Sequence, residues 1–126
     1  MIVGIGTDLV KIARIEASYQ RLGNKFAQRI LTPQEFAQFE TATKPIALLA
    51  KRFAVKEAAG KALGTGIGQG VSWQDISITH NELGAPMLCF SGKAAEYAAA
   101  RQVCGQHVSI SDEDDIATAF VVLESL

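Results

Sequence analysis

The stretch RFAVKEAAGKALGTGIGQG, residues 52–70, decides the fold of this chain. It predicts the second half of a long helix that begins at Pro45, because proline suits the first helical position, and ends at Gly64. The helix carries Glu57 and Lys61 into a run of glycines at every second position. Apolar residues recur along it at helical spacing, so we expect it to be the longest helix and to pack against the core.

The elements that precede the long helix are shorter than it. Residues 2–10 are apolar and interrupted by two glycines, which predicts a buried strand whose backbone is closely approached by another element. A helix is expected from about Ile12 to Leu22, stopped by Gly23. The sequence TPQE, residues 32–35, has the pattern of a capping box with proline at the first helical position, and predicts a second helix.

After the glycines, DISITHN and PMLCF alternate as paired strands around the turn NELGAP. A helix over SGKAAEYAAARQVCG follows, and then HVSIS and IATAFVVLE, two more strands around the acidic turn DEDD. Strands and helices segregate instead of alternating, which favours an α+β fold over a parallel sheet. We find no linker or repeat, so residues 1–126 are expected to form one domain.

Composition narrows the class of protein. With 48% hydrophobic and 20% charged residues and no long apolar run, the 126-residue chain is typical of a soluble domain, and we expect no membrane span. The amino terminus does not resemble a secretory leader, so a cytoplasmic location is expected. Net charge is −1, which argues against a nucleic-acid binder. Cys89 and Cys104 lack metal-site spacing and are predicted to be buried free thiols.

Charge is distributed unevenly. Between Lys11 and Ile30 five cations face one anion, and Arg14, Arg21 and Lys25 are predicted to line one side of the first helix and its continuation. This basic stripe is either a solvated face or a docking surface for an acidic partner. Near the carboxyl end, residues 112–115 form an acidic run.

Two carboxylates are candidates for chemistry. On the long helix Glu57, Gly60 and Lys61 share one face, and a glycine there, costing roughly 1 kcal/mol against alanine, indicates that space is needed beside Glu57. Glu57 and Lys61 could equally form a solvated ion pair. Asp8 either caps the following helix or, if its strand lies against the long helix, converges with Glu57 to bind Mg²⁺.

Two further segments could bind a ligand. The loop GTGIGQG could cradle phosphates with backbone N–H groups or be a flexible turn, and it matches no nucleotide fingerprint. His107, Ser109 and Ser111 share one face of a late strand, which is either solvent-facing or a recognition surface. No nucleophile elbow accompanies them.

These pieces together resemble the holo-[acyl-carrier-protein] synthase family, the small bacterial 4'-phosphopantetheinyl transferases. The resemblance rests on GIGTDLVKIARI (4–15), AKRFAVKEAAGKALGTGI (50–67), NELGAP (81–86) and the strand pair within 107–124, and it covers nearly the whole chain. It implies an α+β fold with an antiparallel sheet packed against one long helix and several shorter helices. It also implies transfer of 4'-phosphopantetheine from coenzyme A to a serine of apo acyl carrier protein, releasing adenosine 3',5'-bisphosphate.

The resemblance also implies roles for particular residues. Asp8 and Glu57 would hold Mg²⁺, and Lys61 would contact the pyrophosphate, so these three are the expected catalytic residues. Small members of the family are homotrimers with coenzyme A in clefts between subunits. The residues expected to contact coenzyme A are Phe53, Lys61, Gly64, Gly66, Pro86, His107 and Ser109. Those expected to dock the carrier protein are Arg14, Arg21 and Lys25.

Some points stay open at the level of sequence. Lys11 and Asp112 stand where many members have glutamate and histidine, and Val10 stands where larger relatives have a second acid. Either Glu57 or a water on the metal could accept the serine proton. Two other functions are alternatives, a non-catalytic module that binds an acidic helical protein and a regulatory domain that binds a phosphate ligand.

Overall fold

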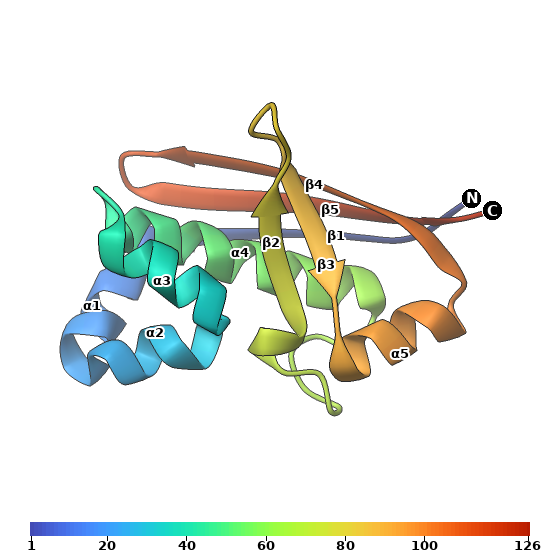
Figure 1. Cartoon of the computed structure of the whole chain (residues 1–126), viewed down its shortest axis with the longest axis horizontal. Coiled ribbons are helices and arrows are strands. Elements are labelled where there is room, and N and C mark those ends of the chain that lie inside the picture. Colours follow the sequence, from blue (N-terminus) through green and yellow to red (C-terminus); the bar gives the residue numbers. More distant parts are fainter.

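The computed structural model describes all 126 residues and is built around one long helix (Figure 1). That helix, α4, covers Pro45–Leu63, as the sequence predicted. No helix is both long and apolar enough to cross a bilayer. In chain order the elements are β1 (Ile2–Lys11), α1 (Ile12–Leu22), α2 (Asn24–Ile30), α3 (Pro33–Thr41), α4, the 3₁₀ turn η1 (Trp73–Asp75), β2 (Ile76–His80), β3 (Pro86–Phe90), α5 (Gly92–Ala100), β4 (Val103–Glu113) and β5 (Ile116–Ser125).

The strands form two antiparallel sheets. The larger has the order β1-β5-β4, so the last strand of the chain lies between the first strand and β4. The smaller is the hairpin β2-β3, which crosses over the side of α4. Gln106 Nε2 on β4 donates to the carbonyl of Leu88 on β3 at 3.2 Å and joins the two sheets. The predicted α+β class and antiparallel hairpins are confirmed.

The amino-terminal helices differ from the prediction in one respect. The chain breaks at Gly23, where φ is +69°, and a separate helix α2 begins at Asn24. Lys25 therefore lies on a different helix from Arg14 and Arg21, and the expected continuation of α1 is wrong. The capping box is confirmed, because Glu35 N donates to Thr32 Oγ1 at 3.2 Å and Thr32 N donates to Glu35 Oε1 at 2.9 Å.

Two glycines let β1 lie directly on α4. A Cβ atom at Gly6 would stand 2.0 Å from the carbonyl oxygen of Ala58, and one at Gly4 would stand 2.0 Å from that of Ala62. Both distances are far inside van der Waals contact, so any side chain there would push the strand off the helix. The close approach expected from the sequence is confirmed, and it fixes the position of the strand that carries Asp8.

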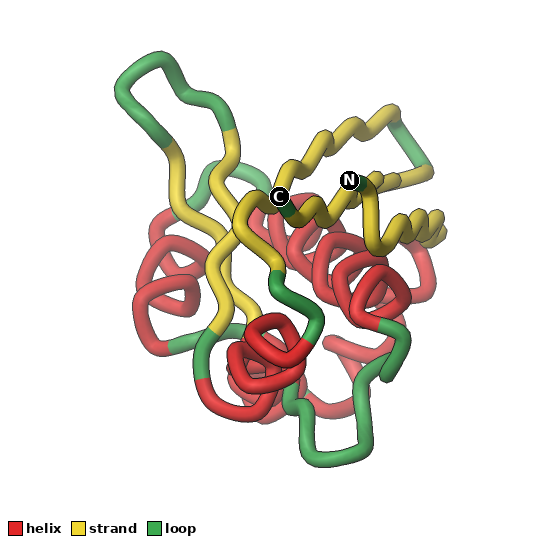
Figure 2. Tube along the Cα trace, turned by 90° about the vertical axis from the view of Figure 1, so that its right-hand side faces the viewer, coloured by secondary structure: helices red, strands yellow, loops and turns green.

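Helix α4 is buried on most of its circumference. The three-stranded sheet lies along one side of it, as the turned view in Figure 2 shows, while α1, α3 and the hairpin contact other sides. Small side chains at the sheet-facing positions, Ala58 and Ala62, are what permit this approach. The largest fully buried side chain in the whole chain is charged: Lys56, with no exposed surface.

Lys56 belongs to a buried ion pair. Its Nζ donates to Glu35 Oε1 at 2.7 Å and to the carbonyl of Ile30 at 2.6 Å. Glu35, 2% exposed, also accepts from the backbone N–H of Ile78 at 3.0 Å through Oε2. One carboxylate thereby links α3, α4 and β2, because each of its partners comes from a different element.

The prediction for the cysteines is wrong in part. Both thiols are free, as expected, but Cys89 and Cys104 are exposed rather than buried. Cys89 alternates on β3 with the buried Leu88 and therefore points away from the core. Cys104 lies at an irregularity in the pairing of β4 with β5, between Val103 and Gly105.

Candidate active site

Asp8 and Lys61 meet where β1 lies over α4. Lys61 Nζ donates to Asp8 Oδ1 at 3.3 Å and to the carbonyl of Thr7 at 2.9 Å. Asp8 lies within β1, opposite Ala119 of β5, while helix α1 starts only at Ile12. Asp8 therefore does not cap that helix, and this alternative is wrong.

Glu57 lies one helical turn before Lys61 and is half-buried. Burial raises the pKa of the Glu57 carboxyl, the negative charge of Asp8 raises it further, and Lys61 acts in the opposite direction. The strand and the helix therefore bring the two carboxylates within electrostatic reach, as the sequence predicted for a strand lying on the long helix. Lys61 directs its ammonium to Asp8, so the solvated Glu57–Lys61 ion pair weighed as an alternative is not the arrangement found.

This arrangement fits a divalent cation. The two carboxylates lie within electrostatic reach of each other, and the Asp8 side chain already accepts from a cationic group, the Lys61 ammonium. Carboxylate oxygens are the ligands Mg²⁺ prefers, usually one or two from the protein with the remainder from water and substrate phosphates. Val10, where larger relatives have a further acid, is 1% exposed and faces the core. The chain therefore offers two carboxylate ligands here, too few for a closed protein cage.

The space expected beside Gly60 is already filled. A Cβ atom at Gly60 would stand 2.9 Å from the carbonyl carbon of Gly66, so the glycine loop folds back onto the helix at this point. The N–H groups of Thr65 and Gly66 donate to the carbonyl of Gly60 at 3.2 and 3.0 Å. These two amides hold the loop to the helix and are not free to cradle phosphates, so Gly60 provides room for the loop and not for a ligand.

Phe53 lies one turn before Glu57 on α4. Its ring stacks on Trp73 with centroids 5.0 Å apart and an interplanar angle of 28°. Trp73 follows the glycine loop, in η1. The stacked pair therefore ties the return of the loop to the same helix that carries Glu57 and Lys61.

The remaining residues expected to contact coenzyme A lie apart from the glycine loop within one chain. Pro86 begins β3 next to the hairpin turn, whereas the loop that follows α4 runs near the other end of that hairpin (Figure 1). His107 and Ser109 are exposed on β4, and His107 Nε2 lies 2.8 Å from Glu124 Oε1. A single chain does not collect all of these residues into one cleft.

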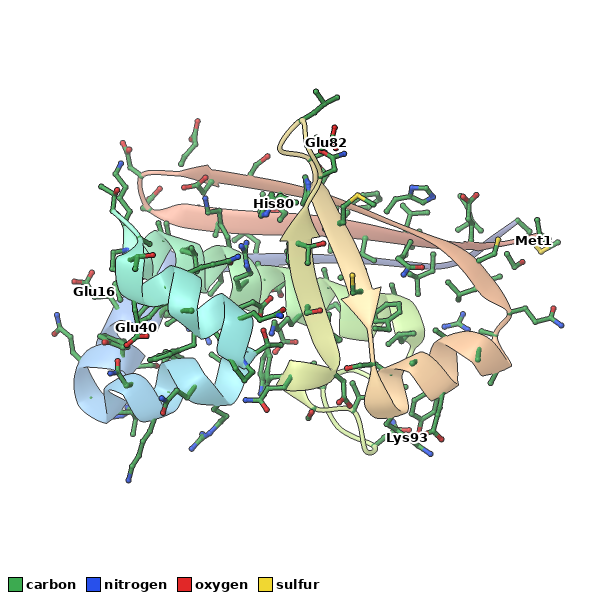
Figure 3. All side chains as sticks on the ribbon, in the orientation of Figure 1. Met1, Glu16, Glu40, His80, Glu82 and Lys93 are labelled. Carbon is green, nitrogen blue, oxygen red and sulfur yellow. The ribbon has the colours of Figure 1, made fainter.

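The hollows in the surface of one chain also lie apart from one another. One of about 340 Å³ lies beside Lys61 and is lined by Ile5, Gly6, Thr7, Lys61 and Phe120. A larger one of about 460 Å³ lies among α1, α3 and the start of α4, where Figure 3 shows Glu16 and Glu40. None of the predicted site residues lines the larger hollow.

The basic residues of the amino-terminal helices are free. Arg14 and Arg21 on α1 and Lys25 on α2 are all exposed, and none of them forms an ion pair within the chain. The break at Gly23 changes the direction of the chain but leaves these side chains on the surface.

Sequence reasoning missed several contributors. Thr7 supplies a carbonyl to Lys61, Trp73 stacks on Phe53, and Glu35 holds Lys56, the residue next to Glu57. Arg101 also lies at the end of α4, with Nη1 donating to the carbonyl of Leu63 at 2.7 Å. Among these residues, only Glu35 belongs to a recognisable sequence motif, the capping box. That motif predicts the start of a helix and not a bond to a buried lysine.

Comparisons with known proteins show the family of this chain. Residues 4–121 match the family model described as "4'-phosphopantetheinyl transferase superfamily". The holo-[acyl-carrier-protein] synthase of Vibrio cholerae is 54% identical over 98% of this chain and 98% of its own, and that of Shewanella halifaxensis is 53% identical over 99% and 100%. The chain therefore belongs to the 4'-phosphopantetheinyl transferase superfamily, and the resemblance seen in its sequence is confirmed.

Solved structures support the same relationship. The crystal structure of holo-[acyl-carrier-protein] synthase from Neisseria meningitidis has a TM-score of 0.94 at 45% identity, covering 99% of this chain and 100% of its own. That of the Helicobacter pylori enzyme in complex with coenzyme A has a TM-score of 0.83 at 36% identity, covering 95% and 99%.

Proposed function

We propose that this protein is a holo-[acyl-carrier-protein] synthase, which transfers 4'-phosphopantetheine from coenzyme A to a serine hydroxyl of apo acyl carrier protein. The observation that carries the proposal is the meeting of Asp8, Glu57 and Lys61 at the crossing of β1 and α4. It occurs in a chain about half identical to named synthases along nearly its whole length.

The reaction requires little covalent help from the protein. The serine oxygen forms a bond to the β-phosphorus of coenzyme A, the bond from that phosphorus to the bridging oxygen breaks, and adenosine 3',5'-bisphosphate leaves. Stabilising the charge on the pyrophosphate is therefore the main task. When bound by Asp8 and Glu57, Mg²⁺ would supply most of that positive charge.

Residues of the chain perform the other steps. Lys61, with its side chain half exposed, can move from Asp8 to a phosphate oxygen as a point charge. The serine proton goes to a base, and Glu57 is proposed for this role because it is the carboxylate one helical turn from Lys61, on the same face of α4. The stacked Phe53 and Trp73 hold the loop beside the phosphates in place.

The coenzyme A site is proposed to lie between subunits. Gly64, Gly66 and Phe53 would form one wall, and Pro86, His107 and Ser109 of another copy would form the opposite wall. The separation of these two groups within one chain supports this arrangement, because only a second copy can bring them together.

An apolar sheet face supports assembly into a homotrimer. On the side of the three-stranded sheet away from α4, Ile5, Leu9 and Phe120 are 60%, 62% and 47% exposed. Large apolar side chains exposed on one sheet face suit an interface with another copy. This face continues into the hollow beside Lys61, so the proposed interface would border the active site.

The carrier protein is proposed to dock on the basic stripe. Arg14, Arg21 and Lys25 are exposed cations without partners, which suits an acidic protein surface. No nucleic acid is expected as a partner, and the cytoplasmic location stays a prediction.

Replacing Glu57 by Gln tests the catalytic assignment. The variant loses a charge at the metal site and the proposed base, so turnover should fall by about two to four orders of magnitude, while the fold is kept. Intact-protein mass spectrometry of apo acyl carrier protein with coenzyme A measures the modified fraction over time. Glu40→Gln, an exposed carboxylate on α3, is the matched control and should retain activity. Near-normal turnover of Glu57→Gln would remove Glu57 from the mechanism.

Thermal shifts separate the enzyme from the two alternatives. Binding to the folded state raises the melting temperature, so a transferase should respond both to coenzyme A with Mg²⁺ and to apo acyl carrier protein. A module that only holds an acidic protein would respond to the carrier protein alone. A phosphate-binding regulator would respond to coenzyme A alone, and either of these results would contradict the proposal.

A further inference from the structure

Arg101 joins three parts of the molecule at the end of the long helix. It follows α5, and its Nη1 donates to the carbonyl oxygens of Ala62 at 3.0 Å and Leu63 at 2.7 Å. Its Nη2 donates to the carbonyl of Val3 on β1. The guanidinium group therefore bridges the carboxyl end of α4 and the strand that carries Asp8.

These contacts complete the pairing of carbonyls at the end of α4. The last four carbonyls of a helix have no partner within it. The first two of these are met by the loop itself: Gly60 accepts from Thr65 and Gly66, and Lys61 accepts from Gly64 at 3.0 Å. The last two, those of Ala62 and Leu63, accept from Arg101 alone among the side chains.

The contact between Arg101 and the end of α4 affects the charge that a ligand meets at this helix end. The carboxyl end of a helix carries roughly half a negative charge, concentrated on these carbonyls. Gly64 and Gly66, at the start of the loop, are proposed to line the coenzyme A site, although their own N–H groups are bonded to the helix carbonyls and do not bind the phosphates. Without compensation, the helix end would repel the anionic ligand that the loop is proposed to bind.

Arg101 supplies that compensation from a fixed position. A Cβ atom at Gly64 would stand 3.6 Å from Arg101 Nη1, so the positive charge lies beside the first glycine of the loop. A full positive charge outweighs the half charge of the helix end and reverses the sign of the local potential. Lys61, in the last turn of α4, is a second cation at this helix end, but its ammonium group bonds to Thr7 and Asp8. Lys93, labelled in Figure 3, lies farther along the loop, beside Gly70.

We infer that Arg101 is a positioning and charge-reversing residue of the coenzyme A site: it holds the glycine loop end of α4 against β1 and makes that helix end attractive to phosphate. The inference rests on the proposed function, since it concerns the same ligand. Arg101 acts through the carbonyls and the loop, and no contact between its guanidinium and the ligand is required.

The test measures coenzyme A binding to the full-length protein by calorimetry in the presence of Mg²⁺, at low and high salt. Arg101→Met removes the charge and should weaken coenzyme A binding about fivefold at low salt. The difference in affinity between this variant and the unaltered protein should become smaller at high salt, because salt screens the charge. Arg101→Lys keeps the charge, so it should bind within about twofold of the unaltered protein even where its melting temperature is lower.

Lys44→Met is the matched control. It removes one positive charge at the opposite end of the same helix, where Lys44 precedes Pro45, and should leave binding unchanged. If Arg101→Met does not fold, Arg101→Gln takes its place, because glutamine keeps N–H donors and drops only the charge.

The outcomes are distinct. Equal affinities for Arg101→Met and Lys44→Met, with the unaltered protein binding normally, would overturn the inference and leave the proposed function standing. Loss of binding in Arg101→Lys as large as in Arg101→Met would also overturn it, because geometry and not charge would then be responsible. If the unaltered protein does not bind coenzyme A, the proposed function itself fails, and the inference fails with it.

Discussion

Replacing Gly6 by Ala tests how closely β1 must lie on α4. The added Cβ atom would stand 2.0 Å from the carbonyl oxygen of Ala58 and 2.8 Å from the backbone nitrogen of Ala62. Both neighbours are backbone atoms of a buried helix, so neither can rotate away as the end of a side chain could. The strand itself must retreat.

The size of the effect follows from these distances. Ordinary contact begins near 3.4 Å, so the strand would move by about 1.4 Å or the helix would deform. Overpacking of this kind costs about 3 kcal/mol of unfolding free energy. Asp8, two residues along β1, would be displaced from Lys61, and a misplacement of roughly 1 Å in a site lowers turnover by about a hundredfold.

Urea denaturation followed by circular dichroism measures the first effect, at one fixed protein concentration because assembly contributes to stability. Carrier-protein modification measures the second. Gly105→Ala is the control for the stability measurement: its Cβ would meet only the side chain of Glu124, at 2.8 Å, which can move. A change below about 1 kcal/mol in Gly6→Ala would refute the reasoning, since the steric conflict would then be relieved at no cost.

Two further predictions concern a buried ion pair and an exposed histidine. Lys56→Met leaves the buried Glu35 carboxylate with Arg52, 3.8 Å away, as its remaining cation and should lower the unfolding free energy by about 3 kcal/mol. The double variant with Glu35→Gln should recover part of the loss, and a single variant as stable as the unaltered protein would contradict this. Burial and the cations Arg52 and Lys51 lower the pKa of His80 from 6.5, so protonation favours the unfolded state. Stability should therefore fall as pH drops below 6.5 and less so in His80→Gln, and parallel melting curves from pH 7 to about pH 5 would contradict that.

Local sequence signals predicted most of the elements. Two predictions were wrong: the helix expected over residues 91–105 ends at Ala100, where β4 soon follows from Val103, and β1 is exposed on one face rather than buried. Pro45 and Gly64 bound the long helix, and the capping box at Thr32 begins α3, because these residues act on the backbone within a few positions. The glycines of β1 correctly indicated a close neighbour. The break at Gly23 was interpreted as a stop but not as the start of a second helix, since α2 has no side-chain cap to announce it.

Partnerships between distant residues could not be predicted. Lys56 resembles a surface lysine in the sequence, but its partner Glu35 lies 21 positions away on another helix. Arg101 meets Val3 across 98 positions, a contact that exists only because the sheet and α4 come together. The thiols were misjudged for a related reason, since apolar neighbours suggested burial whereas the direction of each strand residue depends on register.

The candidate site was predicted in outline and corrected in detail. Asp8, Glu57 and Lys61 come together as the motifs indicated. The prediction that Gly60 leaves space for a ligand was wrong, because the backbone of Gly66 fills the space beside it. Pairing of Lys61 with Thr7 and Asp8 depends on the register of β1 against α4, which the spacing of residues along the helix does not determine.

The most direct test of the central claim is the intact mass of an apo acyl carrier protein after incubation with coenzyme A and this protein, with Mg²⁺ or with a chelator. The account predicts a gain of one 4'-phosphopantetheine on a single serine when Mg²⁺ is present, and none with the chelator. An unchanged mass with every carrier protein tried, although coenzyme A binds, would contradict the transferase assignment.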